Sequence, residues 1–276
     1  MTVLSYFFIL YFFGMNLLIL IPVIIGSIGA GLATGLFGAS AATVLACFLI
    51  VFANFDPYTA IGISLGVDVA ASITVAIVYK KYGNVKVKPA LLLLLFVFIG
   101  VLFGSFISFS LPLNSLAGLT GAVVALIGLT FILSRNSKKM QNGDCNREKL
   151  NFGFGKKNIL LGLTGILTGI IAGMFGGGAG LTMFALLFFL LDYSVHKAVG
   201  TSVFIMIFIA LAGSAMHFYY EPFNGWIILI GSAAASLGGV FSAFIANKLS
   251  EYKLRISIGT SLIVLGAVLF FKVALF

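Results

Sequence analysis

The chain has 276 residues, of which 61% are hydrophobic and only 8% are charged. Soluble domains carry about 25% charged residues, so this chain cannot cover a water-facing surface, which excludes a soluble enzyme, a disordered protein and a nucleic-acid binder. The composition predicts an all-α polytopic membrane protein, and the net charge of +9 therefore needs an explanation other than an anionic macromolecular partner.

The first residues do not look like a cleaved signal peptide. Such a peptide has a positively charged n-region, and residues 1–25 carry no positive charge before the apolar run Tyr6–Phe13. We therefore expect this segment to remain in the protein. Residues 1–19 either extend the first helix or add interfacial or transmembrane length.

Two apolar stretches do not fit a single membrane crossing. The 34 uncharged residues between Lys157 and Asp192 would form about 51 Å of helix, which is too long for one span and short for two. Gly173–Gly180 lies in the middle of this stretch, and each glycine costs a helix about 1 kcal/mol relative to alanine. We predict two short helices broken at the glycines, as a tight pair or a re-entrant hairpin. Residues 20–55 show the same pattern around Gly35–Ser40.

Six further stretches each fit one crossing. A bilayer core of about 30 Å and a rise of about 1.5 Å per residue require roughly 20 residues. The predicted spans are 59–79, 89–109, 115–133, 198–217, 226–246 and 256–275.

The two halves of the chain are related by an internal duplication. A shift of 138 residues aligns them without a gap, and such self-similarity indicates a repeated structural unit. The chain then divides into an N-terminal membrane repeat over 1–133, a basic loop over 134–157 and a C-terminal membrane repeat over 158–276. The shift superimposes Gly31, Gly35, Phe37, Gly38, Ala60, Gly62 and Ser64 on Gly169, Gly173, Phe175, Gly176, Ala198, Gly200 and Ser202.

The two repeats are predicted to have inverted topology. Each half contains a broken pair and three full spans, so its number of crossings is odd whether the pair spans or turns back. The second half therefore enters the membrane from the opposite side. With loop 134–157 in the cytoplasm, 15 of the 16 basic residues lie inside, as the positive-inside rule requires. The net positive charge is thus explained by the membrane topology. The basic residues are also expected to have some affinity for anionic headgroups of the lipid bilayer.

Helix breaks at membrane depth favour an anion site. Unpaired backbone groups are tolerated there only against protein or a water-filled cavity, and the N-terminus of a half-helix offers N–H donors and partial positive charge. Two such breaks near the midplane are typical of a secondary transporter's substrate site. Since the two broken stretches contain no lysine or arginine, backbone and hydroxyl donors would bind a small anionic substrate.

Four motifs surround the predicted breaks: Gly35-Leu-Phe-Gly-Ala-Ser40 and Gly173-Met-Phe-Gly-Gly-Gly178, followed about 20 residues later by Ala60-Ile-Gly-Ile-Ser64 and Ala198-Val-Gly-Thr-Ser202. They resemble the TauE/SafE (sulfite exporter) family of membrane permeases over nearly the whole chain. The second half matches better, because Ala39, Ser40 and Ala41 stand where the family has more glycines and Ile63 replaces a threonine. The resemblance implies passage of small sulfur anions such as sulfite, thiosulfate or sulfonates across a bacterial or archaeal plasma membrane.

The candidate substrate-binding residues are the glycines and hydroxyl residues beside the breaks. Glycines four apart can instead serve close helix packing, and membrane hydroxyls often bond to the preceding turn. Packing does not require three consecutive glycines such as 176–178. The candidates are Gly35, Gly38, Ser40, Thr43, Gly62, Ser64, Gly173, Gly176, Gly177, Gly178, Gly200, Thr201 and Ser202.

Asp68 and His217 are the candidates for proton coupling or gating. Asp68 is the only acid deep within a predicted span. An ionisable residue inside the membrane costs free energy, so it is taken as a functional candidate unless a structural role explains it. The structural alternative for Asp68 is a protonated acid bonded to Ser72 or Ser64 on the same helical face. His217 lies near a helix end before Phe218–Tyr220. The structural alternative to a gating role is therefore that His217 belongs to the aromatic belt at the membrane interface.

The sequence therefore predicts a secondary transporter for a small anion, with Asp68 as a candidate carrier of a coupling proton; the identity of the coupling ion does not follow from the sequence. The alternative is a passive anion channel on the same scaffold, although Asp68 favours coupled transport. An intramembrane enzyme would need a nucleophile with a base, or paired acids, which the spans lack. We expect no metal and no cofactor, because the two histidines and two cysteines lie far apart without ligand spacing.

Overall fold

The computed structural model describes residues 17–112, 119, 129, 156–175, 179–189, 191, 193–249, 260 and 263–264. All regular secondary structure in these residues is helical, which confirms the predicted all-α class. The helices are α2 (Leu17–Phe37), α3 (Ala41–Phe52), α4 (Pro57–Lys81), α5 (Val87–Ser110), α7 (Lys156–Phe175), α8 (Ala179–Phe189), α9 (Val195–Tyr220) and α10 (Gly225–Ala246).

Five of the described helices, α2, α4, α5, α9 and α10, are long and apolar enough to cross a membrane. Four of the predicted spans correspond to α4, α5, α9 and α10. The predicted spans 115–133 and 256–275 are described only at isolated residues, and residues 1–16 and 134–155 lie outside the described part of the chain.

Both long apolar stretches are broken as predicted. In the first, α2 ends at Phe37 and α3 starts at Ala41, and in the second, α7 ends at Phe175 and α8 starts at Ala179. Gly38 has φ +65°, a left-handed conformation that side chains with a Cβ atom rarely adopt. This glycine therefore fixes the place where α2 stops.

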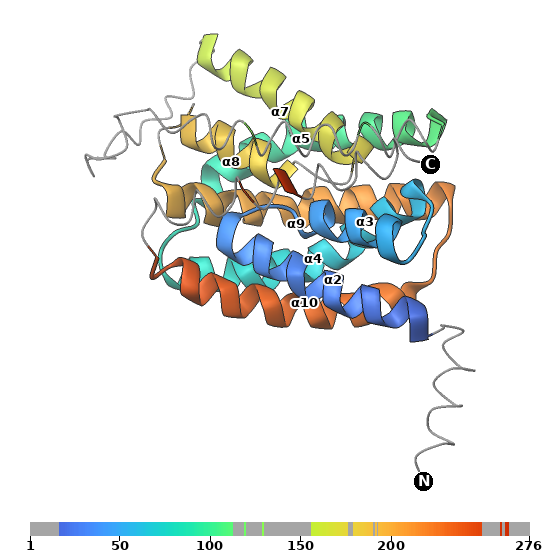
Figure 1. Cartoon of the computed structure of the whole chain (residues 1–276). Coiled ribbons are helices and arrows are strands. Elements are labelled where there is room, and N and C mark those ends of the chain that lie inside the picture. The colour runs from blue at the N-terminus through green and yellow to red at the C-terminus, as the bar shows by residue number, and fades with distance from the viewer. Residues whose placement is uncertain are drawn as a thin grey trace.

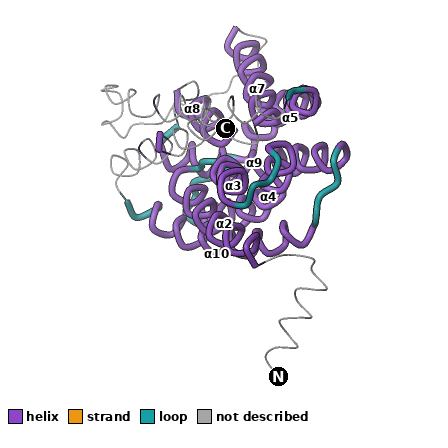
Figure 2. The backbone as a smooth tube through the Cα atoms, turned by 45° about the vertical axis from the view of Figure 1, so that its right-hand side comes forward, coloured by secondary structure: helices purple, strands orange, loops and turns teal. Residues whose placement is uncertain are grey.

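The helices form three groups (Figures 1 and 2). α2 pairs with α10 on one side, α5 pairs with α7 on the opposite side, and α4 and α9 lie between the two pairs. The short helices α3 and α8 pack against the central helices. Large apolar side chains such as Leu95, Phe103 and Leu237 are exposed on the outer helices, as expected for surfaces that face lipid.

The outer pairs are held by backbone-to-backbone approach at glycines. A Cβ atom on Gly31 would lie 2.9 Å from the Gly239 nitrogen, and one on Gly35 would lie 2.8 Å from the Ala243 nitrogen. α2 and α10 therefore run parallel. α5 and α7 approach in the same way, since the added Cβ of Gly169 would lie 2.9 Å from the Gly100 Cα atom. Small residues permit this close packing of membrane helices.

The contacts repeat with the 138-residue shift. Gly31 of α2 faces Ala235 and Gly239 of α10, and the equivalent Gly169 of α7 faces Val97 and Val101 of α5, at the equivalent positions. The pairs α2–α10 and α7–α5 are therefore two copies of one arrangement.

The central helices α4 and α9 are equivalent to each other under the same shift, and they run antiparallel. The added Cβ of Gly62, near the start of α4, would lie 2.8 Å from the Cβ of His217, near the end of α9. At the other end of the pair, an added Cβ of Gly200, near the start of α9, would lie 3.0 Å from the Cβ of Tyr79, near the end of α4. The two helices that the shift makes equivalent therefore run in opposite directions.

Charged residues separate to opposite ends of the bundle. The end of α4 meets the start of α9, where the Lys86 backbone N–H donates to Thr201 Oγ1 at 3.0 Å and Asn84 bonds to Asn247 at 2.9 Å. Asp56 and Glu221 flank the opposite ends of these helices. The basic end contains Lys80, Lys81, Lys86, Lys197 and Lys248.

Candidate functional site

The two helix breaks meet each other. A Cβ atom on Gly180, in the first turn of α8, would lie 2.6 Å from the Ser40 nitrogen and would overlap the Gly38 carbonyl oxygen. A Cβ atom on Gly38 would lie 3.0 Å from Ser202 Oγ of α9. We call the region formed by Gly38, Ser40, Gly180 and Ser202 the central junction. Glycines are needed there because the two backbones leave no room for side chains.

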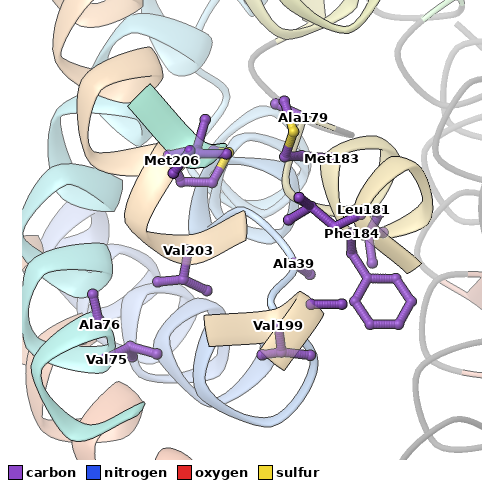
Figure 3. Close-up of a cluster of buried hydrophobic side chains, with 14 of the residues drawn as sticks. Ala39, Val75, Ala76, Ala179, Leu181, Met183, Phe184, Val199, Val203 and Met206 are labelled. Atoms are coloured by element: carbon purple, nitrogen blue, oxygen red, sulfur yellow. The ribbon is translucent and has the colours of Figure 1, made fainter. Parts of the chain in front are cut away.

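The central junction lies at mid-height of the bundle. Ser40 bonds to Asp68, which is the twelfth of the 25 residues of α4, so it lies about 17 Å and about 20 Å from the two helix ends. Figure 3 shows Ala39 of the first break in one buried cluster with side chains of α4, α8 and α9.

Asp68 is fully buried and binds the start of α3. Its carboxylate accepts hydrogen bonds from Ser40 Oγ, from the Ala41 backbone N–H at 3.0 Å and from Ser72 Oγ at 3.0 Å. The bond to Ser72 is the one anticipated on the same helical face. Ser64 is not a partner, because its buried Oγ atom makes no hydrogen bond to any residue that the structure describes.

His217 is fully buried, so its interpretation as an interfacial belt residue is wrong. Its Nδ1 atom lies 3.2 Å from the Tyr58 carbonyl oxygen, its Nε2 atom lies 3.1 Å from the Gly173 carbonyl oxygen, and its ring stacks on Tyr58 at 4.1 Å. α7 ends two residues after Gly173, and carbonyls in the last turn of a helix lack intrahelical partners. His217 supplies a partner to one of them.

Tyr79 makes the corresponding contact in the first half and was not among the sequence-derived candidates. Its hydroxyl donates to the Gly35 carbonyl oxygen at 2.9 Å. Tyr79 and Gly35 are equivalent to His217 and Gly173 under the 138-residue shift. The shift applied to His217 would have pointed to Tyr79, although the two side chains differ.

Several candidate glycines serve helix packing. Gly35 packs on α10 and Gly173 on α5 through their backbones, while Gly62 faces Phe223 and Gly200 faces Asn84. These four residues lie along helix interfaces and do not point into the central junction.

The hydroxyl candidates have different surroundings. Thr201 accepts the Lys86 N–H at 3.0 Å, and Ser202 donates to the Val199 carbonyl at 2.9 Å while lying against Gly38. Thr43 is buried in the first turn of α3. The structure thus brings Gly38, Ser40, Asp68 and Ser202 together, whereas Gly176, Gly177 and Gly178 lie outside the described residues.

Electrostatics differ between the ends of the bundle. Partial burial, followed by the nearby Asp56 carboxylate, raises the pKa of Glu221 above its ordinary value. Asp56 and Glu221 thus lie at one end of the bundle and the lysines at the other. Within the central junction, the Ser40 and Ser202 hydroxyls donate to Asp68 and to the Val199 carbonyl, and the Gly38 N–H donates to the Thr34 carbonyl at 2.9 Å.

Two broken helices that meet at mid-height of a bundle with five membrane-length apolar helices define a polytopic membrane protein. The family model "Sulfite exporter TauE/SafE" matches residues 23–269, so the chain belongs to this family, as its motifs suggested. TauE/SafE proteins are membrane transporters. Neither the curated proteins nor the solved structures compared with the chain show a match.

Proposed function

We propose that the protein is a secondary transporter that moves a small sulfur oxyanion or organosulfonate, such as sulfite, thiosulfate or sulfoacetate, by alternating access. The observation that carries the proposal is the contact between the two helix breaks, since Gly180 of α8 lies against Gly38 and Ser40. Midplane sites of secondary transporters are built from such discontinuous helices. Family membership supports the anion class.

Inverted repeats supply the alternating access. The antiparallel pair α4–α9 and the repeated pairs α2–α10 and α7–α5 support two halves of opposite orientation that rock against each other. The basic end of the bundle, together with loop 134–157, faces the cytoplasm in this proposal. The membrane is the plasma membrane of a bacterium or archaeon.

The substrate binds at the start of α8. The first turn of α8 binds the oxyanion in this proposal, because a helix N-terminus attracts negative charge, and the candidate glycines Gly176–Gly178 directly precede this turn in the sequence. Ser64 adds a hydroxyl, since its buried Oγ atom has no hydrogen-bond partner among the described residues. Ser202 lies at the other side of the central junction, against Gly38.

Coupling uses a proton at Asp68. An ionised carboxylate beside the central junction repels an anionic substrate, so protonation of Asp68 and entry of the substrate favour each other. A passive channel on the same scaffold would need no such linkage. His217 contributes to gating in this proposal, because its ring lies between the Gly173 carbonyl at the end of α7 and the Tyr58 carbonyl at the start of α4.

The first test is ligand binding followed by flux. Detergent-purified protein is heated with sulfite, thiosulfate, sulfoacetate, taurine, sulfate or chloride, because a ligand of the folded state raises the apparent Tm. Stabilisation by one or two sulfur anions identifies the substrate class, and that anion is then assayed for uptake into proteoliposomes. Saturable uptake without single-channel currents supports a transporter, and single-channel currents would instead show a channel.

A matched pair of variants locates the site. Gly177→Leu adds a large side chain just before α8, at the proposed anion site, and should abolish uptake while the protein still folds. Gly29→Leu adds the same side chain to α2 at a position with no atom within 4 Å of an added Cβ, and uptake should persist. Wild-type uptake by Gly177→Leu would place the substrate elsewhere.

A further inference from the structure

The N-terminus of α3 is already occupied by an anionic group from the protein itself. The Asp68 side chain reaches from α4 and accepts the Ala41 backbone N–H at 3.0 Å, together with the hydroxyls of Ser40 and Ser72. α3 has 12 residues. This is the contact that a free anion makes at a helix start, where N–H groups and partial positive charge converge.

Asp68 replaces the usual local cap of α3. Helix N-caps are commonly serines whose hydroxyl accepts an N–H of the first turn. Ser40 occupies the N-cap position, yet its side chain makes no capping hydrogen bond and its hydroxyl donates to Asp68 instead. A hydroxyl that donates to a carboxylate forms a strong, charge-assisted bond. Ser40 thus acts as a ligand of the Asp68 carboxylate.

The second half of the chain contains no equivalent of this arrangement. Under the 138-residue shift, Asp68 corresponds to Met206, Ser72 to Ala210 and Ser40 to Gly178. Met206 and Ala210 are buried in α9, and Met206 belongs to the same buried cluster as Ala179, the first residue of α8 (Figure 3). A methionine sulfur is only a weak hydrogen-bond acceptor, and alanine offers none.

We infer that Asp68 is a built-in anion that fills the first of two equivalent anion sites, so that the chain binds one external anion, at α8. The part of this inference that concerns α3 stands on the hydrogen bonds of Asp68. The part that concerns α8 rests on the proposed function. Because Gly180 packs on Ser40, the filled site and the open site adjoin each other.

Chemical rescue tests whether the α3 site is an anion site. Asp68→Ala removes the carboxylate and leaves space for formate, which carries the same charged group. Formate should raise the apparent Tm of full-length Asp68→Ala in a concentration-dependent manner, and neutral formamide of similar size should not. Met206→Ala is the matched control, because it opens space at the equivalent position without removing an anion, and formate should raise its apparent Tm no more than it raises that of the wild type, whose α8 site is also open.

A second measurement uses a substitution that keeps the shape of the side chain. The chain has four aspartates, Asp56, Asp68, Asp144 and Asp192, so a carbon-13 spectrum of protein labelled at the aspartate carboxyl is simple to assign. The signal lost in Asp68→Asn should be that of an ionised carboxylate at neutral pH without substrate.

Three results would overturn the inference: equal stabilisation of Asp68→Ala by formate and formamide, an equal response of Met206→Ala to formate, or a protonated Asp68 at neutral pH. Neither experiment uses a sulfur anion or a transport assay. A failed search for the substrate therefore leaves the result at α3 intact. Conversely, a failed rescue leaves the anion site at α8 to be tested by the variants of Gly177.

Discussion

Replacement of Gly31 by alanine should weaken the pair α2–α10. The added Cβ atom would overlap the Ala235 carbonyl oxygen and lie 2.8 Å from its carbonyl carbon. Carbon atoms pack at about 3.5–4.0 Å, so the two helices must separate by roughly 1 Å or distort. Overpacking of this kind costs about 1–3 kcal/mol. For a chain of this size, each kcal/mol lowers Tm by about 2–4 °C, which gives a total loss of about 2–12 °C.

Thermal unfolding in detergent measures this loss, with circular dichroism or the fluorescence of the single tryptophan, Trp226, as the signal. Gly29→Ala is the matched control on the same helix, because no atom lies within 4 Å of its added Cβ. The equivalent substitution Gly169→Ala should lower Tm as Gly31→Ala does, since its Cβ would lie 2.9 Å from Gly100. An apparent Tm of Gly31→Ala equal to that of Gly29→Ala would refute the packing argument.

Three further variants test the site and the topology. Asp68→Asn should transport without the pH dependence of the wild type, because residue 68 can no longer bind a proton, and an unchanged pH profile of uptake would make Asp68 purely structural. Tyr79→Phe removes the hydroxyl that donates to the Gly35 carbonyl and should cost about 1–3 kcal/mol of stability, measured by thermal unfolding against the wild type. An impermeant maleimide applied outside should label a cysteine placed at Glu221 and not the native Cys145, and labelling of both from one side would contradict the inverted topology.

The spans and the breaks could be predicted because they depend on local properties of the chain. Hydropathy over about 20 residues located α4, α5, α9 and α10, and glycine clusters located both breaks. The bond between Ser72 and Asp68 was also accessible, since the two residues are four apart on one helix. Each of these features follows from helix geometry and from the cost of polar groups in lipid.

The long-range partners could not be predicted in this way. Nothing near Asp68 in the sequence indicates that it binds Ser40 and Ala41, 28 and 27 residues away. His217 seemed interfacial because it lies close to a helix end. The start of α4 and the end of α7 cover it, however, and it is buried. Depth along a helix does not determine burial when neighbouring helices end at the same level.

The two halves agree where backbones touch and differ where side chains reach the breaks. Gly31 and Gly169 occupy equivalent helix contacts, so the duplicated scaffold keeps one packing geometry. In contrast, Tyr79 and His217 bond to equivalent carbonyls with different groups.

If the two halves were identical, the inward-open and outward-open states would have equal energy, because each half would make in one state the contacts that the other half makes in the other state. Asp68 removes that equality. Its carboxylate is bonded to α3 in the first half, while the equivalent position in the second half is Met206. In the proposed transporter, the free-energy difference between the two states therefore depends on whether Asp68 carries a proton, which would link the exchange of states to protonation.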